Sequence, residues 1–261
     1  MNPSVPTPVD VKLMNMTALV LVVAFAALCL LALARGVSRL SVFDIQGIAV
    51  TGEVNHNNAV TLRANVAPRL SGTFFTVDLA RVRAAFESLP WVRRAVVRRD
   101  FPNRLRVELQ EHQPVAYWGG DGDVRLINSY GEVFEANVGE VEQDNLPRLS
   151  GPEGQSADVL AMYRTITPLF EKVDLPVDQL EMSSGGSWRL QLDSGATIEM
   201  GRGSVDEVSA RVNRFLKTLT QVTSRYGRQA NAIEAADLRH ENGYAIRLRG
   251  VSTVPVEGPK K

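Results

Sequence analysis

The longest apolar run of the chain lies near its N-terminus, where residues 13–34 carry no formal charge between Lys12 and Arg35. At ~1.5 Å of rise per residue, a helix of this length crosses a hydrocarbon core of ~30 Å. A cleavable signal peptide is the alternative, because residues 32–34 spell a small-x-small cleavage pattern, but its apolar region spans only ~7 to 15 residues. The pattern predicts a transmembrane helix over 13–34, after a Pro-rich, disordered tail over 1–12.

The next segment, 40–112, alternates extended and helical patterns. An extended run ends at a Thr-Gly turn signal, and two short amphipathic helices follow, one capped by the Asn57-Asn58 pair and ending near Leu70, the other capped by Asp78. Two Val-rich runs, 91–99 and 105–111, then flank a Phe-Pro-Asn turn. The predicted order is β-α-α-β-β.

From residue 113 to 250 the pattern becomes strands and turns with two helices, 157–172 and 205–226, whose apolar positions recur every three or four residues. Ser204 and Glu207 have the spacing of a capping box at the start of the second helix. The fold class is therefore α+β: a transmembrane helix, a β-α-α-β-β domain, a mostly antiparallel β domain with two packed helices, and a disordered tail over 251–261. The predicted strands of the β domain are 115–118, 125–128, 131–135, 146–149, 179–182, 188–192, 197–200, 232–238 and 244–249.

Composition removes several classes of function. The 29 basic and 29 acidic residues balance, which argues against a nucleic-acid binder, for which a domain pI above ~9 is typical. One cysteine forms no internal disulfide, and the three histidines are too scattered for a metal site. The 201–204 loop lacks the third Gly or the Lys of phosphate-binding motifs, and no Gly-x-Ser-x-Gly occurs. The sequence predicts no enzyme, no cofactor, no metal and no small-molecule substrate.

A basic cluster lies on the hairpin of the first domain. Anionic lipid headgroups or an acidic partner would suit such a cluster. The alternative is the solvated face of a strand pair, with the arginines paired to Asp100 and Glu108. The cluster that forms this candidate recruitment or lipid surface is Arg93, Arg94, Arg98 and Arg99.

The last strand of the β domain is a second candidate surface. Its alternation places Tyr244, Ile246 and Leu248 on one face, and Ala245, Arg247 and Arg249 on the other. As the final strand, it is predicted to be a sheet edge, which presents N–H and C=O groups to an incoming strand. The alternative is that its arginines block unwanted pairing.

Several runs, in order and spacing, resemble one family, the bacterial cell-division proteins FtsQ and DivIB. The chain departs from the family pattern at Asn128, where Asp is usual, and at His240, where an aromatic residue is usual. The runs that carry the resemblance are Leu89-Pro90-Trp91-Val92, residues 95–99, 102–107 and 111–116, Leu126-Ile127, residues 131–134 and 146–152, Ser187-Trp188, Asp237-Leu238-Arg239 and residues 242–245.

The resemblance implies a POTRA domain over 40–112 and a non-enzymatic scaffold of the divisome at the septum. It implies a single-pass type II protein of the inner membrane, with its N-terminus cytoplasmic and its bulk periplasmic, although Arg35 and Arg39 after the span favour the opposite orientation. The scaffold would couple divisome assembly with septal peptidoglycan synthesis.

The implied partners are FtsB and FtsL, with FtsA, FtsK, FtsN, FtsW and FtsI as further divisome candidates. FtsB of the FtsB–FtsL pair would bind the C-terminal strands. The residues carried over to this surface are Arg239, His240, Glu241, Asn242, Gly243, Tyr244, Ala245, Ile246 and Arg247.

Two other functions compete with this interpretation. A POTRA-bearing envelope secretion or chaperone module would bind client strands by the same edge pairing, but such modules normally have several POTRA copies or a membrane barrel. A membrane-anchored wall hydrolase would need an acid pair or zinc ligands, which the sequence does not offer.

Overall fold

The computed structural model describes residues 9–38, 40–56, 59–66, 68, 71–120, 125–141, 146–240 and 243–251. The chain divides into two compact units, Met1–Glu111 and His112–Lys261, and each unit has its own hydrophobic core. Of the two tails predicted to be disordered, residues 1–8 and 252–261 lie outside the described residues.

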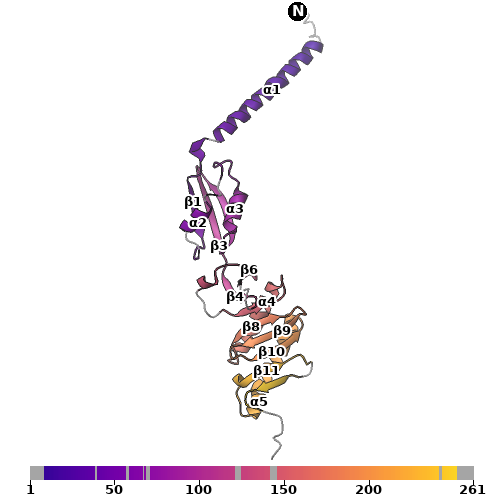
Figure 1. Cartoon of the computed structure of the whole chain (residues 1–261). Helices are drawn as coiled ribbons and strands as arrows, with labels where there is room; N and C mark the ends of the chain where they lie inside the picture. Colours follow the sequence, from indigo (N-terminus) through magenta and orange to yellow (C-terminus); the bar gives the residue numbers. More distant parts are fainter. Residues whose placement is uncertain are drawn as a thin grey trace, which may run out of the picture. The chain divides into compact units, whose positions relative to one another are not determined.

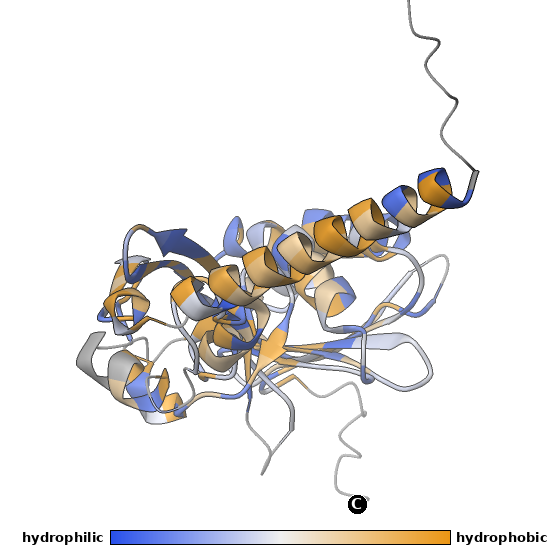
Figure 2. Cartoon of the chain, turned by 90° about the horizontal axis from the view of Figure 1, so that it is seen from above, coloured by the Kyte–Doolittle hydropathy of each residue, from blue (hydrophilic) through white to orange (hydrophobic). Residues whose placement is uncertain are grey.

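The first helix, α1 (Val9–Ser38), contains the whole apolar run and extends four residues beyond it at each end. Among the described residues it is the one helix long and apolar enough to cross a membrane, and none of its most apolar window is buried. Figure 2 shows hydrophobic residues along its length. The polar ends remain helical because each added residue completes another backbone hydrogen bond. The membrane helix is therefore longer than predicted, and it fits a single-pass membrane protein.

The rest of the first unit has the predicted β-α-α-β-β order (Figure 1). Its sheet has the order β1-β3-β2, with β1 parallel and β2 antiparallel to the central β3. Asp78 caps α3, since its carboxylate accepts the N–H groups of Ala80 and Arg81 at 2.9 and 3.2 Å. The elements are a 3-10 helix (Ser41–Phe43), β1 (Gly47–Gly52), α2 (Ala59–Val66), α3 (Leu79–Glu87), β2 (Val92–Asp100) and β3 (Arg104–Glu111).

The structure describes only part of the segment in which the first helix of this domain was predicted. Helix α2 (Ala59–Val66) covers the first part of the predicted helix. Leu70 and the predicted caps Asn57 and Asn58 lie outside the described residues. The apolar side of the domain is nevertheless well defined, because Phe86, Leu105 and Val107 are fully buried in one cluster.

The second unit is built on a nine-stranded sheet of order β12-β11-β10-β9-β8-β7-β4-β5-β6. Five of its eight strand pairs are antiparallel, which confirms a mostly antiparallel sheet. The strands are β4 (Pro114–Trp118), β5 (Arg125–Asn128), β6 (Val133–Phe134), β7 (Arg148–Ser150), β8 (Val177–Met182), β9 (Ser187–Leu192), β10 (Thr197–Arg202), β11 (Ile233–Asp237) and β12 (Ala245–Leu248).

Three pairs, β4–β7, β7–β8 and β10–β11, are parallel. Parallel neighbours need a crossover connection, usually a helix. Helix α4 (Ser156–Glu171) connects β7 to β8, and α5 (Val205–Arg225) connects β10 to β11. Short 3-10 helices lie at Val138–Glu140 and Ala230–Ala232.

Helices α4 and α5 contact each other and share one core with the sheet. The predicted capping box at the start of α5 is confirmed: Ser204 N donates to Glu207 Oε2 at 2.8 Å, and Glu207 N donates to Ser204 Oγ at 3.4 Å. Because both helices cover one face, alternate residues of β10, β11 and β12 face away from the core. The candidate partner surface lies on this side and at this end of the sheet.

Candidate functional site

Strand β12 forms one end of the nine-stranded sheet, as the sequence predicts. It pairs antiparallel with β11, with Ala245 opposite Asp237 and Arg247 opposite Ala235. Just beyond the strand, Arg249 N donates to Ala232 O at 2.8 Å. Backbone groups of an edge strand alternate between the neighbour and the open side, so the N–H of Ile246 is directed to the open side.

The inner face of β12 and the residue before it pack on the core. The ring of Tyr244 packs edge-on against Phe215 at 4.9 Å, and its hydroxyl lies 2.8 Å from Thr218 Oγ1, both on α5. Ile246 packs against the same core. Of the residues predicted to bind a partner, Tyr244 and Ile246 therefore hold the edge strand in place with their side chains.

The outer face of β12 presents Ala245 and Arg247, both exposed. Together with neighbouring strands they line a groove of about 390 Å³. The short side chains of Ala235, opposite Arg247, and of Ala245, opposite Asp237, leave this space open, because longer side chains at these two positions would fill it. Its lining residues are Thr197, Glu199, Ala235, Ala236, Asp237, Ala245, Ile246 and Arg247.

Arg239 follows β11 and is held by Asp237. Its backbone N–H and Nε donate to Oδ1 at 3.0 and 2.9 Å, and Nη2 donates to Oδ2 at 2.6 Å. These hydrogen bonds from Arg239 lower the pKa of Asp237 to about 2. The arginine side chain is still 60% exposed. The two side-chain bonds use the Nε side of the guanidinium, so its Nη1 side remains for a second carboxylate.

Gly201 is a residue of this site that sequence reasoning missed. Its φ is +78°, and a Cβ at this position would lie 3.0 Å from Arg239 Cγ. The arginine therefore extends across the backbone of β10 at a point where a Cβ would press against its side chain. The sequence showed Gly201 only as part of a loop between a strand and a capping box, and no local pattern connects it to Arg239.

The other predicted residues of this surface lie at the turn between β11 and β12. His240 and Gly243 are exposed. Glu241 and Asn242 lie outside the described residues. Arg247 Nη1 lies 3.7 Å from Glu234 Oε1, and both side chains are at least half exposed. Such an exposed pair contributes little to stability, so exchanging Glu234 for another carboxylate would cost Arg247 little.

The four arginines of the basic cluster on β2 do not have the same role in the structure. Arg93 Nη1 donates to Gln110 Oε1 at 3.1 Å. Arg99 donates from Nε to Phe74 O at 2.7 Å and from Nη2 to Val77 O at 2.9 Å. Arg94 and Arg98 are exposed. Arg99 is thus committed to holding the 73–77 loop, and the proposed recruitment surface is reduced to Arg94, Arg98 and the partly buried Arg93.

The histidines outside the edge take part in local packing. His56 stacks on Trp91 at 3.9 Å, with Nδ1 3.3 Å from Glu111 Oε2. His112 stacks on Phe134 at 4.1 Å. In the part of the chain that the structure describes, no three His, Cys, Asp or Glu side chains are grouped as metal ligands.

Asn128, a departure from the family pattern, lies at a tight turn. Its Oδ1 accepts the N–H groups of Tyr130 and Glu132, both at 2.9 Å. Its Nδ2 lies 2.9 Å from His112 Nδ1. The side-chain oxygen of Asn128 thus accepts backbone N–H groups as a carboxylate oxygen would, and its amide nitrogen adds a donor.

Comparison with known proteins identifies the family. Residues 43–112 match the model described as "POTRA domain, FtsQ-type", and residues 116–239 match "Cell division protein FtsQ/DivIB, C-terminal". The cell division protein FtsQ of Thiomonas arsenitoxydans is 39% identical over 94% of this chain and 89% of its own length. The chain belongs to the FtsQ/DivIB family.

Other relatives agree with this assignment. FtsQ of Burkholderia pseudomallei is 40% identical over 90% of this chain and 89% of its own length, and FtsQ of Bordetella pertussis is 34% identical over 92% of both. FtsQ/DivIB proteins are cell division proteins and not a known enzyme family, which favours a division role over a secretion module or a wall hydrolase. The match to the C-terminal family model ends at Arg239, so β12 lies beyond it.

Proposed function

We propose that the chain is a non-enzymatic scaffold of the divisome that binds FtsB of the FtsB–FtsL pair by strand addition to β12. Its N-terminus lies in the cytoplasm and both domains lie in the periplasm. In this position it couples divisome assembly with septal peptidoglycan synthesis, and FtsA, FtsK, FtsN, FtsW and FtsI are further candidate partners. Recruitment to midcell uses the first domain, with Arg94 and Arg98 as its candidate contacts.

The observation that supports this proposal most strongly is the open edge at β12. An added strand forms main-chain hydrogen bonds with the edge, and side-chain sites beside the edge select the sequence that binds. Here two such sites lie beside the edge. One is the groove lined by Ala245 and Arg247, and the other is the Nη1 side of Arg239, which its bonds to Asp237 do not use. A partner segment that pairs with β12 and carries a carboxylate near Arg239 would satisfy both sets of groups.

The first test asks whether the charge of Arg239 is recognised by the partner, as distinct from a general effect of breaking a surface ion pair. Arg239→Glu in the full-length protein is expected to lower co-purification with FtsB and FtsL from membranes by at least about tenfold, because a buried like charge opposes the partner carboxylate. Arg106→Glu is the matched control: Arg106 is also 60% exposed and lies 3.4 Å from Asp100. Recovery with the control should equal that of the wild type.

A second pair of variants tests strand addition itself. Ile246→Pro removes the N–H directed to the open side, whereas Ile246→Ala shortens the side chain even more and keeps the N–H. We expect FtsB and FtsL to be lost only with proline. Equal recovery with both variants, together with wild-type recovery for Arg239→Glu, would reject β12 as the binding edge.

The cellular role is tested by replacing the native protein with a fluorescent fusion. Midcell recruitment, with filamentation on depletion, is the expected result. Uniform envelope fluorescence and normal division on depletion would contradict a divisome role.

A further inference from the structure

Four large apolar side chains are exposed where the chain passes from α1 into the first domain. Leu40 is 52% exposed, Val42 67%, Phe75 49% and Phe101 74%. They come from three segments: the residues after α1, the 73–77 loop, and the turn between β2 and β3. We name these four residues the aromatic patch. Single exposed apolar residues are ordinary on a protein surface, but a contiguous group marks an interaction site.

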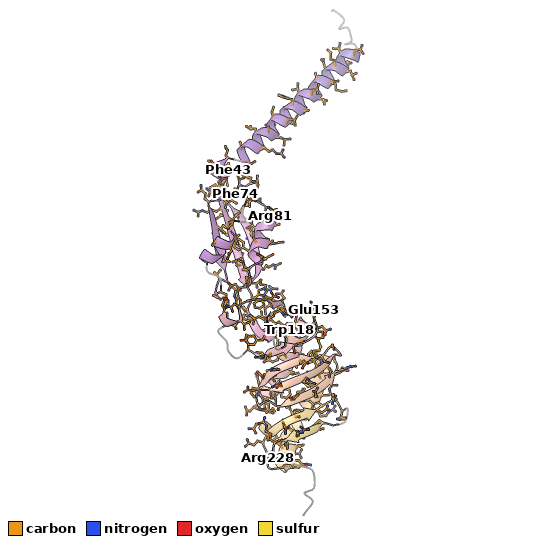
Figure 3. All side chains as sticks on the ribbon, viewed as in Figure 1. Phe43, Phe74, Arg81, Trp118, Glu153 and Arg228 are labelled. Atoms are coloured by element: carbon orange, nitrogen blue, oxygen red, sulfur yellow. The ribbon has the colours of Figure 1, made fainter. Side chains whose placement is uncertain are left out.

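Two less exposed phenylalanines connect Phe75 with Phe101, and Leu40 and Val42 adjoin these rings through the 3-10 turn that ends at Phe43. The ring of Phe75 lies 4.8 Å from that of Phe43 and 5.2 Å from that of Phe74. Phe74 in turn lies 5.9 Å from Phe101. All these contacts are edge-to-face, the arrangement that aromatic pairs favour. Figure 3 labels Phe43 and Phe74 at the end of the domain that follows α1.

Hydrogen bonds hold the three segments together. Phe74 N donates to Phe43 O at 2.7 Å, and Gln46 N donates to Asn103 O at 2.9 Å. Arg99 fixes the loop through the carbonyls of Phe74 and Val77. The exposed rings therefore belong to an ordered surface.

The patch is also tied to the end of the membrane helix. Thr73 Oγ1 donates to Ser38 O, the last residue of α1, at 2.7 Å. Ser38 is the fourth residue after Ala34, the end of the apolar run, which corresponds to a rise of ~6 Å. The headgroup layer on one side of a bilayer has about this thickness. A span that puts Ala34 at the edge of the hydrocarbon core therefore puts Ser38 at the aqueous edge of the headgroup layer, and the patch begins two residues later.

We propose that the aromatic patch docks the first domain onto the bilayer, with the side chains of Phe75 and Phe101 inserted among the lipid headgroups. Phe and Leu side chains favour the boundary between headgroups and acyl chains. The covalent connection through α1 keeps the patch at that boundary, so docking needs no diffusional encounter. The membrane contact proposed here is thus formed by exposed apolar side chains, a different surface from the arginine cluster on β2. This proposal rests on the membrane span of α1 and is independent of the partner proposed for β12.

The test uses the full-length protein in vesicles of phosphatidylcholine, with Cys29→Ala and one nitroxide-labelled cysteine. Labels replace Phe75 or Phe101, and controls replace Val96, which is exposed on β2, or Tyr226, which is exposed at the end of α5. Collision rates with oxygen, which concentrates in lipid, and with a water-soluble nickel chelate report the surroundings of each label. We expect the ratio of oxygen to nickel collisions to be at least about threefold higher at 75 and 101 than at the controls.

A second variant shows whether the patch acts as a unit. Phe101→Asp should shift the label at position 75 toward water, whereas Val96→Asp should leave it unchanged. Equal ratios at all four label positions would overturn the proposal. So would labels at 75 and 101 that are aqueous in lipid vesicles and become shielded only when other division proteins are added, because the patch would then bind a protein.

Discussion

Asp237 and Arg239 form a two-point ion pair beside the open edge of the sheet, with Nε–Oδ1 and Nη2–Oδ2 distances of 2.9 and 2.6 Å. The pair fixes the guanidinium without using its Nη1 side. If the proposed partner binds here, Arg239 is already held in position, and less conformational entropy would be lost when a partner carboxylate pairs with it. Asp237 is a positioning residue in this arrangement.

Replacing Asp237 should change stability in a pH-dependent way. Its pKa is lowered from 3.8 to about 2 in the folded protein, so the pair stabilises the fold fully above pH ~4, and this stabilisation is lost as the pH falls toward 2. Because Arg239 is well exposed, solvent screening keeps this contribution small. We expect Asp237→Asn to be slightly less stable than the wild type at pH 7, with a difference that shrinks progressively as the pH falls from 4 toward 2, measured by urea unfolding in detergent. A gap that stays constant with pH would contradict the assigned pair.

The contact between Gly201 and Arg239 gives a prediction with a close control. Gly201→Ala and Gly195→Ala both place a side chain at positive φ, +78° and +81°, but a Cβ at Gly195 has no atom within 4 Å. Each should cost about 1–2 kcal/mol of stability from backbone strain. Only Gly201→Ala should also displace Arg239 and lower the recovery of FtsB and FtsL. If both variants bind equally, the position of Arg239 does not matter for binding.

Adjacent arginines on β2 should respond very differently to truncation. Arg99→Ala removes two hydrogen bonds to the carbonyls of Phe74 and Val77, and we expect a loss of about 1–3 kcal/mol. Arg98→Ala removes an exposed side chain and should stay within about 0.5 kcal/mol of the wild type. Hydrogen exchange of residues 73–77 gives a second measure, because only Arg99→Ala should accelerate it. Equal effects would show that Arg99 does not hold the loop.

The elements that the sequence predicted well are those specified by neighbouring residues. The regular spacing of apolar residues in α5, its Ser204–Glu207 capping box, and the Asp78 cap of α3 all act within one or two helical turns. The alternation of β12 likewise follows from the period of two in a strand. The predicted partner role of this edge stays a prediction, because the structure gives its position and no binding.

Contacts between distant residues were not predictable in the same way. Strand β7 has only three residues and pairs in parallel with both β4 and β8, and no local pattern selects those neighbours. The arginine cluster appeared uniform in the sequence, yet Arg99 has carbonyl partners more than twenty residues away. The exposed patch of Phe75 and Phe101 appears only when the loop and the hairpin turn come together.

By itself, the sequence determined the membrane helix, the β-α-α-β-β order and the two amphipathic helices of the β domain, because hydrophobic period and capping act over a few residues. Only the tertiary structure decided that Arg239 is held by Asp237 and crosses Gly201, that Tyr244 is anchored on α5, and that an aromatic patch follows the span. These features depend on which strands and loops become neighbours. That choice is made by packing of the whole chain, which no short segment encodes.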